Sequence, residues 1–156
     1  MGEKEHRNGL NLSADSEKIL SATLHRAEAL GQITFSTPDL LFQLSYHPTI
    51  IRFLSGLNID PDHLRFVLEN GSSSSKGKNG QRLRNGVVVV PSGAVKRAIE
   101  IAKFEAQRSG STTVEPHHLL GGLIMERTGA ASKTLKAMGV EREKMAQNDQ
   151  LLAPSI

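Results

Sequence analysis

The sequence contains no cysteine and no tryptophan, and aromatic residues make up only 4% of its 156 residues. The lack of cysteine excludes a disulfide framework and a thiolate metal site, and it fits a reducing compartment. With so few aromatic side chains, the core must come mainly from small aliphatic residues, which suits helices packed on helices. No apolar run is long enough to span a membrane, and the N-terminus lacks the apolar stretch of a secretory signal. We therefore expect a cytoplasmic protein.

The net charge of +3 comes from one polar segment, residues 70–86, which is rich in glycine, serine and asparagine. This segment holds Lys76, Lys78, Arg82 and Arg84 and no acidic residue, so the other 15 lysines and arginines face 16 acidic residues. Its composition predicts a flexible linker. Because no aromatic side chains stand between these cations, the segment favours a solvated linker, and binding of nucleic acid is the alternative.

Two similar segments lie on either side of this linker. Gly31 and Gly110 are 79 residues apart, and helix-capping and apolar residues match at the same offset, which becomes 81 further along. The sequence predicts two pseudo-symmetric repeats, 12–69 and 87–147, packed together as one domain. Matched pairs include Ser13 with Ser92, Ala27 with Ala106, Thr34 with Thr113, and Leu54 with Leu135.

Each repeat has the pattern of four short helices, so the expected fold is all-α with about eight helices. Ser13 and Ser92 are suitable N-caps for the first helix of each repeat, and Gly31 and Gly110 are suitable C-terminal stops. Apolar residues at helical spacing predict the buried stripe of each helix. These stripes are Leu20, Thr23, Ala27 and Leu30 in the first repeat, and Val95, Ile99, Ala102 and Ala106 in the second.

The second helix of each repeat opens with a cap followed by proline. Thr37 is the expected cap before Pro38, and Glu115 is the expected cap before Pro116. Proline fits this place because the first amides of a helix have no partner within the helix.

The remaining helices are predicted from shorter patterns. A third helix is expected over 49–55, with its counterpart over 130–137, and a fourth begins at Asp60. The counterpart of the fourth helix, after Glu141, has few apolar residues and is expected to be short. Residues 87–90 are apolar and β-branched, which is typical of a short strand or of an extended segment leading to proline.

No pattern for catalysis or metal binding stands out. His117 and His118 are adjacent, so on a helix they project about 100° apart and cannot bind one metal as a local pair. Residues 71–78 contain one spacer residue too many for a phosphate-binding loop and follow no predicted strand. No G-x-S-x-G nucleophile motif occurs. We therefore expect no enzyme activity, no cofactor and no metal.

The order of these motifs resembles the Clp N-terminal (Clp repeat) domain of Clp/Hsp100 ATPases. Each repeat of that family resembles F-T-x-x-A-x-x-V-L, E-A-x-x-x-G, G-T-E-H-L-L-L-G-L and V-L-x-x-L-G-V-D in order. The resemblance covers roughly residues 12–147. The first copy here is LSADSEKIL, RAEALG, FSTPDLLFQL and FLSGLNID, and the second is PSGAVKRAI, FEAQRSG, VEPHHLLGGLI and TLKAMGVE.

The resemblance implies a non-catalytic protein-binding module that docks adaptor or substrate polypeptides for a Clp chaperone or protease. If the chain is complete at Ile156, it resembles a stand-alone N-domain-like protein, which lacks an ATPase module. One alternative is an N-terminal fragment of a full Clp ATPase, in which residues 147–150 begin a linker. Another is a nucleic-acid-associated protein that acts through the basic linker.

The resemblance also indicates where partners would bind. In some members an acidic residue of G-T-E-H in each repeat recognises phosphorylated arginine, but Pro38 and His117 stand at those positions here. Phosphoarginine recognition is therefore not expected, because neither side chain is a carboxylate. The expected partner-binding residues are exposed side chains at the starts of the two second helices, where backbone amides are free. They are Asp39, His117 and His118, for which helix capping alone is the alternative role.

Overall fold

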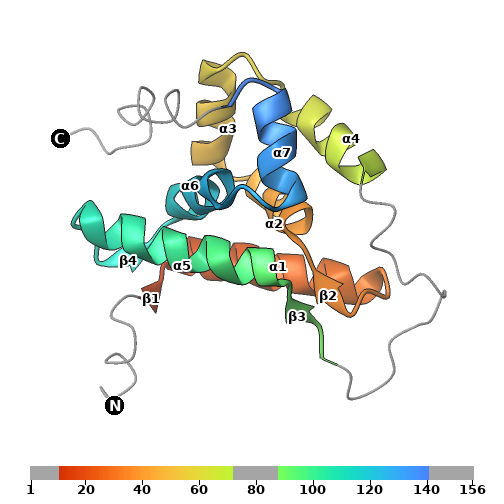
Figure 1. Cartoon of the computed structure of the whole chain (residues 1–156), viewed down its shortest axis with the longest axis horizontal. Coiled ribbons are helices and arrows are strands. Elements are labelled where there is room, and N and C mark those ends of the chain that lie inside the picture. Colours follow the sequence, from red (N-terminus) through yellow and green to blue (C-terminus); the bar gives the residue numbers. More distant parts are fainter. Residues whose placement is uncertain (1–10, 72–87, 141–156) are drawn as a thin grey trace.

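The computed structural model describes residues 11–71 and 88–140, and within them it contains seven α-helices and four two-residue strands (Figure 1). The all-α prediction is confirmed. The short helix expected after Glu141 and most of the predicted linker 70–86 lie outside the described residues. In chain order, the elements are β1 (Asn11–Leu12), α1 (Ala14–Ala29), β2 (Thr34–Phe35), α2 (Thr37–Leu44), α3 (Pro48–Gly56), α4 (Pro61–Gly71), β3 (Val90–Pro91), α5 (Gly93–Arg108), β4 (Thr113–Val114), α6 (Pro116–Glu126) and α7 (Ala130–Ala137).

The two long helices begin and end where the sequence predicts. The side chain of Ser13 accepts a hydrogen bond from the third amide beyond it at the start of α1, and Ser92 does the same at the start of α5. Beyond the ends of these helices, Gly31 and Gly110 have φ angles of 76° and 81°. This left-handed backbone suits glycine, which has no Cβ.

The predicted buried stripe of α1 is partly wrong. Leu20 is only partly buried and Leu30 is 42% exposed, whereas Ser16 and Ile19 are buried. The helix is turned so that the Ser16 hydroxyl donates to the Val114 carbonyl oxygen at 2.7 Å, a contact with the other repeat. The buried face is therefore set by a distant partner. In α5, the buried residues are Val95, Ala98, Ala102 and Ala106, so Ala98 takes the place expected for Ile99.

The sequence predicted Thr37 as the N-cap of α2, but the N-cap is Ser36. Thr37 is the first helical residue, and only 2% of it is exposed. Its hydroxyl oxygen accepts a hydrogen bond from the Ala131 amide, 3.1 Å away at the start of α7. Thr37 thus joins α2 to a helix of the second repeat. In the second repeat, Glu115 is the N-cap of α6, as predicted.

The short strands link the two repeats. β1 pairs in parallel with β4, and β3 pairs in parallel with β2, so the first strand of each repeat lies beside the second strand of the other. The amides of Ser13 and Ser92 extend this pairing by donating to Val114 and Phe35 at 3.0 and 2.9 Å. Val90 is the start of a strand, as one of the two interpretations of residues 87–90 expected.

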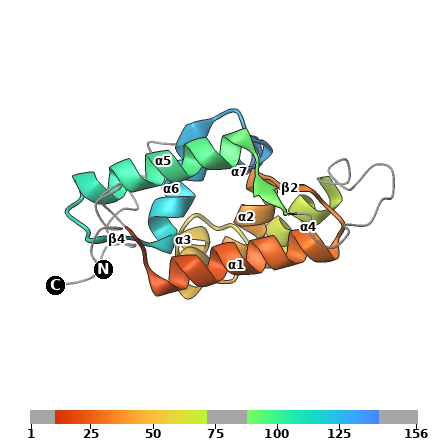
Figure 2. The same ribbon diagram turned by 90° about the horizontal axis from the view of Figure 1, so that it is seen from below.

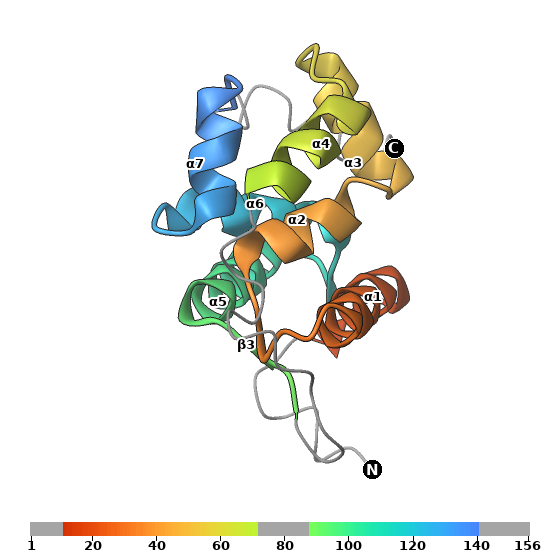
Figure 3. The ribbon, with the colours of Figure 1, turned by 90° about the vertical axis from the view of Figure 1, so that its right-hand side faces the viewer.

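The helices form layers around one shared core. The first layer contains α1 and α5, and the second contains α2 and α6, which cross them. The third layer, on the far side of α2 and α6, contains α3, α4 and α7 (Figures 2 and 3). The buried apolar residues of both repeats belong to one cluster. Its members include equivalent leucines of α2 and α6 that are at most 1% exposed, namely Leu40, Leu41, Leu44, Leu119, Leu120 and Leu123.

Candidate functional site

Asp39 and His118 occupy equivalent positions, the third residues of α2 and α6. The Asp39 carboxylate accepts the Ser36 amide at 2.8 Å, and His118 Nδ1 accepts the Glu115 amide at 2.9 Å. Each side chain thereby completes a capping box with the residue before its helix. Only 5% of Asp39 and 7% of His118 is exposed, so the expectation that both are exposed is wrong. Their partner-binding role stays a prediction.

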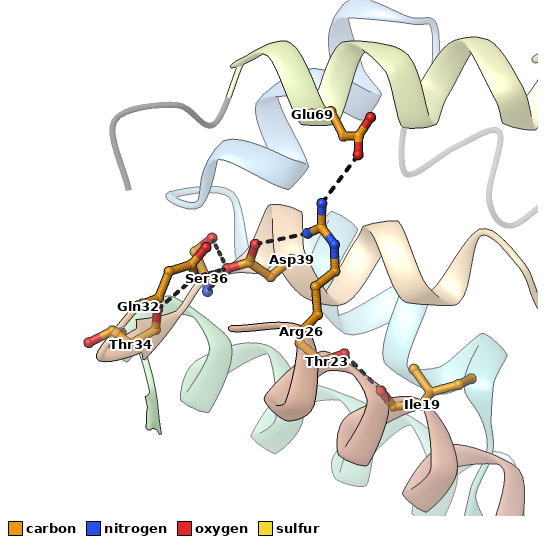
Figure 4. Close-up of polar contacts among 8 residues, drawn as sticks. All are labelled: Ile19, Thr23, Arg26, Gln32, Thr34, Ser36, Asp39 and Glu69. Carbon is orange, nitrogen blue, oxygen red and sulfur yellow. Dashed lines mark hydrogen bonds and ion pairs between the residues drawn. The ribbon is translucent and has the colours of Figure 1, made fainter. Parts of the chain in front are cut away.

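The Asp39 carboxylate is surrounded by donors (Figure 4). Its Oδ2 also accepts the Ser36 hydroxyl at 3.0 Å and Gln32 Nε2 at 3.1 Å, and its Oδ1 lies 3.8 Å from Arg26 Nη1. Arg26 continues outward, because its Nη2 lies 3.3 Å from a Glu69 carboxylate oxygen on α4. The network therefore ties α1, α2 and α4 together, and Asp39 is its inner end.

His118 is held in its neutral form. Burial, together with the neighbouring His117, lowers the pKa of His118 from its ordinary value of 6.5 to about 4. The two imidazole rings are 4.2 Å apart, and His117 is half-buried at the start of α6. Because His118 Nδ1 accepts the Glu115 amide, a proton on that nitrogen would break the capping box.

Replacing His118 by glutamine should remove one source of acid sensitivity. The folded pKa of His118 lies below its unfolded value, so the unfolded chain takes up the proton first as the pH falls below about 6.5. This proton uptake lowers the free energy of unfolding of the wild type by about 2 kcal/mol between pH 7 and pH 5. Glutamine can accept the same amide hydrogen bond at either pH. Urea unfolding followed by circular dichroism measures both values.

The exposed His63 on α4 provides the matched control for this experiment. His63→Gln should keep the pH dependence of the wild type, whereas His118→Gln should lose less stability on acidification. Equal losses in the wild type and in His118→Gln would show that His118 does not resist protonation.

A surface of alternating cations and aromatic rings lies beside the Asp39 network. The Arg26 guanidinium carbon is 4.1 Å from the centre of the Phe42 ring, and that of Arg65 is 4.0 Å from the centre of the Tyr46 ring. The two rings meet edge to face, with their centres 5.7 Å apart. Phe42 is buried, whereas Tyr46 is 55% exposed. We call these four side chains the Tyr46 surface.

Arg65 is fixed in place by neighbouring groups. Its Nη1 donates to the carbonyl and hydroxyl oxygens of Ser45 at 2.9 and 3.0 Å, and its Nη2 donates to the Asp62 carboxylate at 2.5 Å. Tyr46 therefore packs against a guanidinium that is itself hydrogen-bonded to Ser45 and Asp62. Sequence reasoning missed this surface. Phe42 and Tyr46 are spaced one helical turn apart, but nothing in the sequence pattern indicates that arginines from α1 and α4 cover them.

Three features are absent from the described residues. Across residues 11–71 and 88–140, no three histidine or acidic side chains lie close enough together to hold a metal ion. In the same ranges, every buried side-chain nitrogen and oxygen has a hydrogen-bond partner. None of the described helices is long and apolar enough to cross a membrane.

Most of the chain, residues 11–138, matches the profile of the Clp repeat (R) N-terminal domain. The chain belongs to the Clp N-terminal domain family. It is 28% identical over 134 residues to the negative regulator of genetic competence ClpC/MecB of Bacillus subtilis. That match covers 85% of this chain but only 16% of the relative, so this Clp N-domain spans about a sixth of the length of that protein.

Solved structures share the fold. The N-terminal domain of the caseinolytic protease-associated chaperone ClpD from Arabidopsis thaliana superimposes with a TM-score of 0.64 at 20% identity, covering 91% of this chain and 92% of the other. The N-domain of ClpV, solved in complex with a VipB peptide, superimposes with a TM-score of 0.71 at 11% identity, covering 91% and 86%. At these identities the likeness establishes the fold alone.

Proposed function

We propose that this Clp N-domain is a non-catalytic module that docks adaptor or substrate polypeptides for a Clp chaperone or protease in the cytoplasm. The observation that carries the proposal is the Tyr46 surface, on which a half-exposed tyrosine is held by a fixed arginine. Membership of the family supports the general role, and the peptide bound to the ClpV N-domain supports a polypeptide as the ligand. The absence of cysteine fits a reducing compartment.

The chemistry of the Tyr46 surface favours protein contacts. Tyrosine and arginine are the side chains that most often dominate binding energy at interfaces, because they offer a large contact area together with hydrogen-bond donors. Arg65 is already ordered by Ser45 and Asp62, so a partner would not have to immobilise it. The phenol hydroxyl of Tyr46 leaves one polar group for a peptide backbone.

Tyr46→Ala should weaken partner capture about tenfold or more, because a truncated aromatic anchor costs about 2 kcal/mol of binding free energy. The measurement is a pull-down from native lysate with the tagged full chain, quantifying Clp ATPase, Clp protease and adaptor proteins. Phe104→Ala is the matched control, since Phe104 is an aromatic residue on α5 that is 60% exposed. It should leave capture unchanged.

Two outcomes would contradict the proposed function. One is the recovery of no Clp component and no adaptor by the wild-type chain. The other is equal loss of capture in Tyr46→Ala and Phe104→Ala, which would remove the Tyr46 surface from the docking role. Circular dichroism of each variant ensures that the comparison is between folded proteins.

The same docking function could be carried out as part of a longer Clp ATPase. The relative ClpC/MecB, of which this chain matches only 16%, favours this second candidate. The genomic reading frame around the coding sequence decides between the two. The nucleic-acid alternative depends on Lys76, Lys78, Arg82 and Arg84, which lie outside the described residues, and it stays a prediction.

A further inference from the structure

The two repeats carry opposite charge. Residues 11–71 contain four lysines and arginines and seven acidic residues, a net charge of −3, with histidine taken as neutral. Residues 88–140 contain seven lysines and arginines and four acidic residues, a net charge of +3. The overall charge of the described residues is therefore zero, but each half has a distinct electrostatic character.

Six of the seven cations of the second repeat are exposed, and five of these lie near the start of α5, on α7 or in the turn that joins α6 to α7. Arg97 Nη2 donates to the Thr128 hydroxyl at 2.9 Å, which brings α5 against the turn between α6 and α7. Figures 2 and 3 show α5 and α7 on the same side of the domain, with α1 on the opposite side. We call these exposed residues the basic face; they are Lys96 and Arg97 on α5, Arg127 in the turn, and Lys133 and Lys136 on α7.

Nearby carboxylates leave most of this positive charge uncompensated. Glu126 is buried beneath Arg97, with 1% of its side chain exposed and its Oε2 3.1 Å from Arg97 Nη2. Burial opposes its ionisation, but hydrogen bonds from Thr128, Gly129 and Arg97 hold the pKa of Glu126 below its ordinary value. Glu100 lies 3.7 Å from Lys103, and α7 contains no acidic residue. Arg97 is thus fixed while its side chain stays 59% exposed.

The basic face does not follow from the repeat itself. At the offsets that relate the two repeats, Lys96 corresponds to Glu17 and Lys136 to Ser55, while Arg97 and Lys133 correspond to Lys18 and Arg52. The first repeat therefore has an acidic residue and a serine at two of the places where the second repeat has lysine. Helix packing can therefore be satisfied without this charge, so the packing of the repeat does not account for the basic face.

We propose that the basic face binds an acidic segment of the polypeptide that this Clp N-domain docks. The proposal rests on the proposed function and adds the charge of the partner. An acidic polypeptide fits better than nucleic acid, because Glu100 stands among the cations and would repel a continuous phosphate backbone. Glutamate and aspartate side chains spaced along a peptide can pair with separate cations and avoid Glu100.

The test is the binding of a fluorescein-labelled peptide of alternating glutamate and alanine to the full chain, measured by fluorescence anisotropy at about 50 mM salt, where screening is weak. The double variant Lys133→Glu with Lys136→Glu should bind about tenfold more weakly, because each reversal replaces an attraction by a repulsion. The control is Lys18→Glu with Arg52→Glu, which changes the total charge equally on exposed residues of the first repeat. It should bind like the wild type within about twofold.

Three results would overturn the proposal. The first is the absence of peptide binding at low salt, and the second is equal weakening of peptide binding in both double variants. The third is that a single-stranded DNA of the same length binds more tightly than the peptide and that this DNA binding is lost in the Lys133 and Lys136 variant. The pull-down separates this inference from the proposed function. If the Lys133 and Lys136 variant still captures the Clp partners but the acidic peptide does not bind the wild-type chain, the proposed docking function is retained. The proposal that the basic face binds an acidic segment is then wrong.

Discussion

Gly122→Ala is expected to lower the free energy of unfolding by about 3 kcal/mol. A Cβ built on Gly122 would lie 2.1 Å from the Ala98 carbonyl oxygen and 3.2 Å from the Ala102 amide nitrogen, both on the backbone of α5. Backbone atoms cannot rotate away as the end of a side chain can, so α5 and α6 would have to separate. Leu119 and Leu123 of α6 are core residues, and the separation would loosen their packing.

Gly93→Ala is the matched control for this prediction. At Gly93, on the first turn of α5, an added Cβ would meet only Arg97 Nη1 at 3.6 Å, an ordinary van der Waals contact. Alanine forms helix better than glycine, so this variant should gain about 0.5 to 1 kcal/mol. Urea unfolding followed by circular dichroism measures both variants. A Gly122→Ala protein as stable as the wild type would contradict the close crossing of α5 and α6.

The close crossing belongs to one repeat only. In the first repeat, Phe42 and Gln43 stand where the second has Gly121 and Gly122. On the facing helix, Ile19 corresponds to Ala98. Larger side chains keep α1 and α2 further apart, and the Phe42 ring is covered by Arg26 instead of by a helix backbone. The Tyr46 surface therefore arises where the repeat departs from its own pattern.

Local signals predicted the limits of the helices well. Ser13, Ser92, Gly31 and Gly110 act within one turn of their own helix, and the limits of α7 match the prediction from repeat spacing. The errors arose where a distant group decides. The buried face of α1 is oriented by a carbonyl in β4, and Thr37 is drawn inward by an amide of α7. Two-residue strands are too short to show an alternating pattern.

The candidate site was predicted less well for the same reason. The repeat offset correctly placed Asp39 and His118 at the starts of equivalent helices, but it carried no information about burial. Gln32 and Arg26 enclose Asp39, and this could be seen only once α1 and α2 were packed. The Tyr46 surface takes its members from three helices and the turn after α2. The basic face takes its members from two helices and a turn, so neither could be read from a linear motif.

Phe53→Ala is expected to lower the free energy of unfolding by about 4 kcal/mol, because it removes a large ring from a site with no solvent exposure. Phe53 lies on α3, which packs against α4 of its own repeat and α6 of the other. The matched control is Phe66→Ala on α4, where the ring is 63% exposed. The control should change stability by no more than about 0.5 kcal/mol.

The Phe53→Ala protein also tests whether the two repeats are one folding unit. Tyr46 is the only tyrosine and the chain has no tryptophan, so intrinsic fluorescence reports on the first repeat. Amide hydrogen exchange in α5 and α6 reports on the second. Since both repeats contribute to the cluster around Phe53, the two signals should change together in urea. If the fluorescence of Tyr46 changed at low urea while α5 and α6 stayed protected, each repeat would be stable by its own packing, and the shared core would not be what holds the domain together.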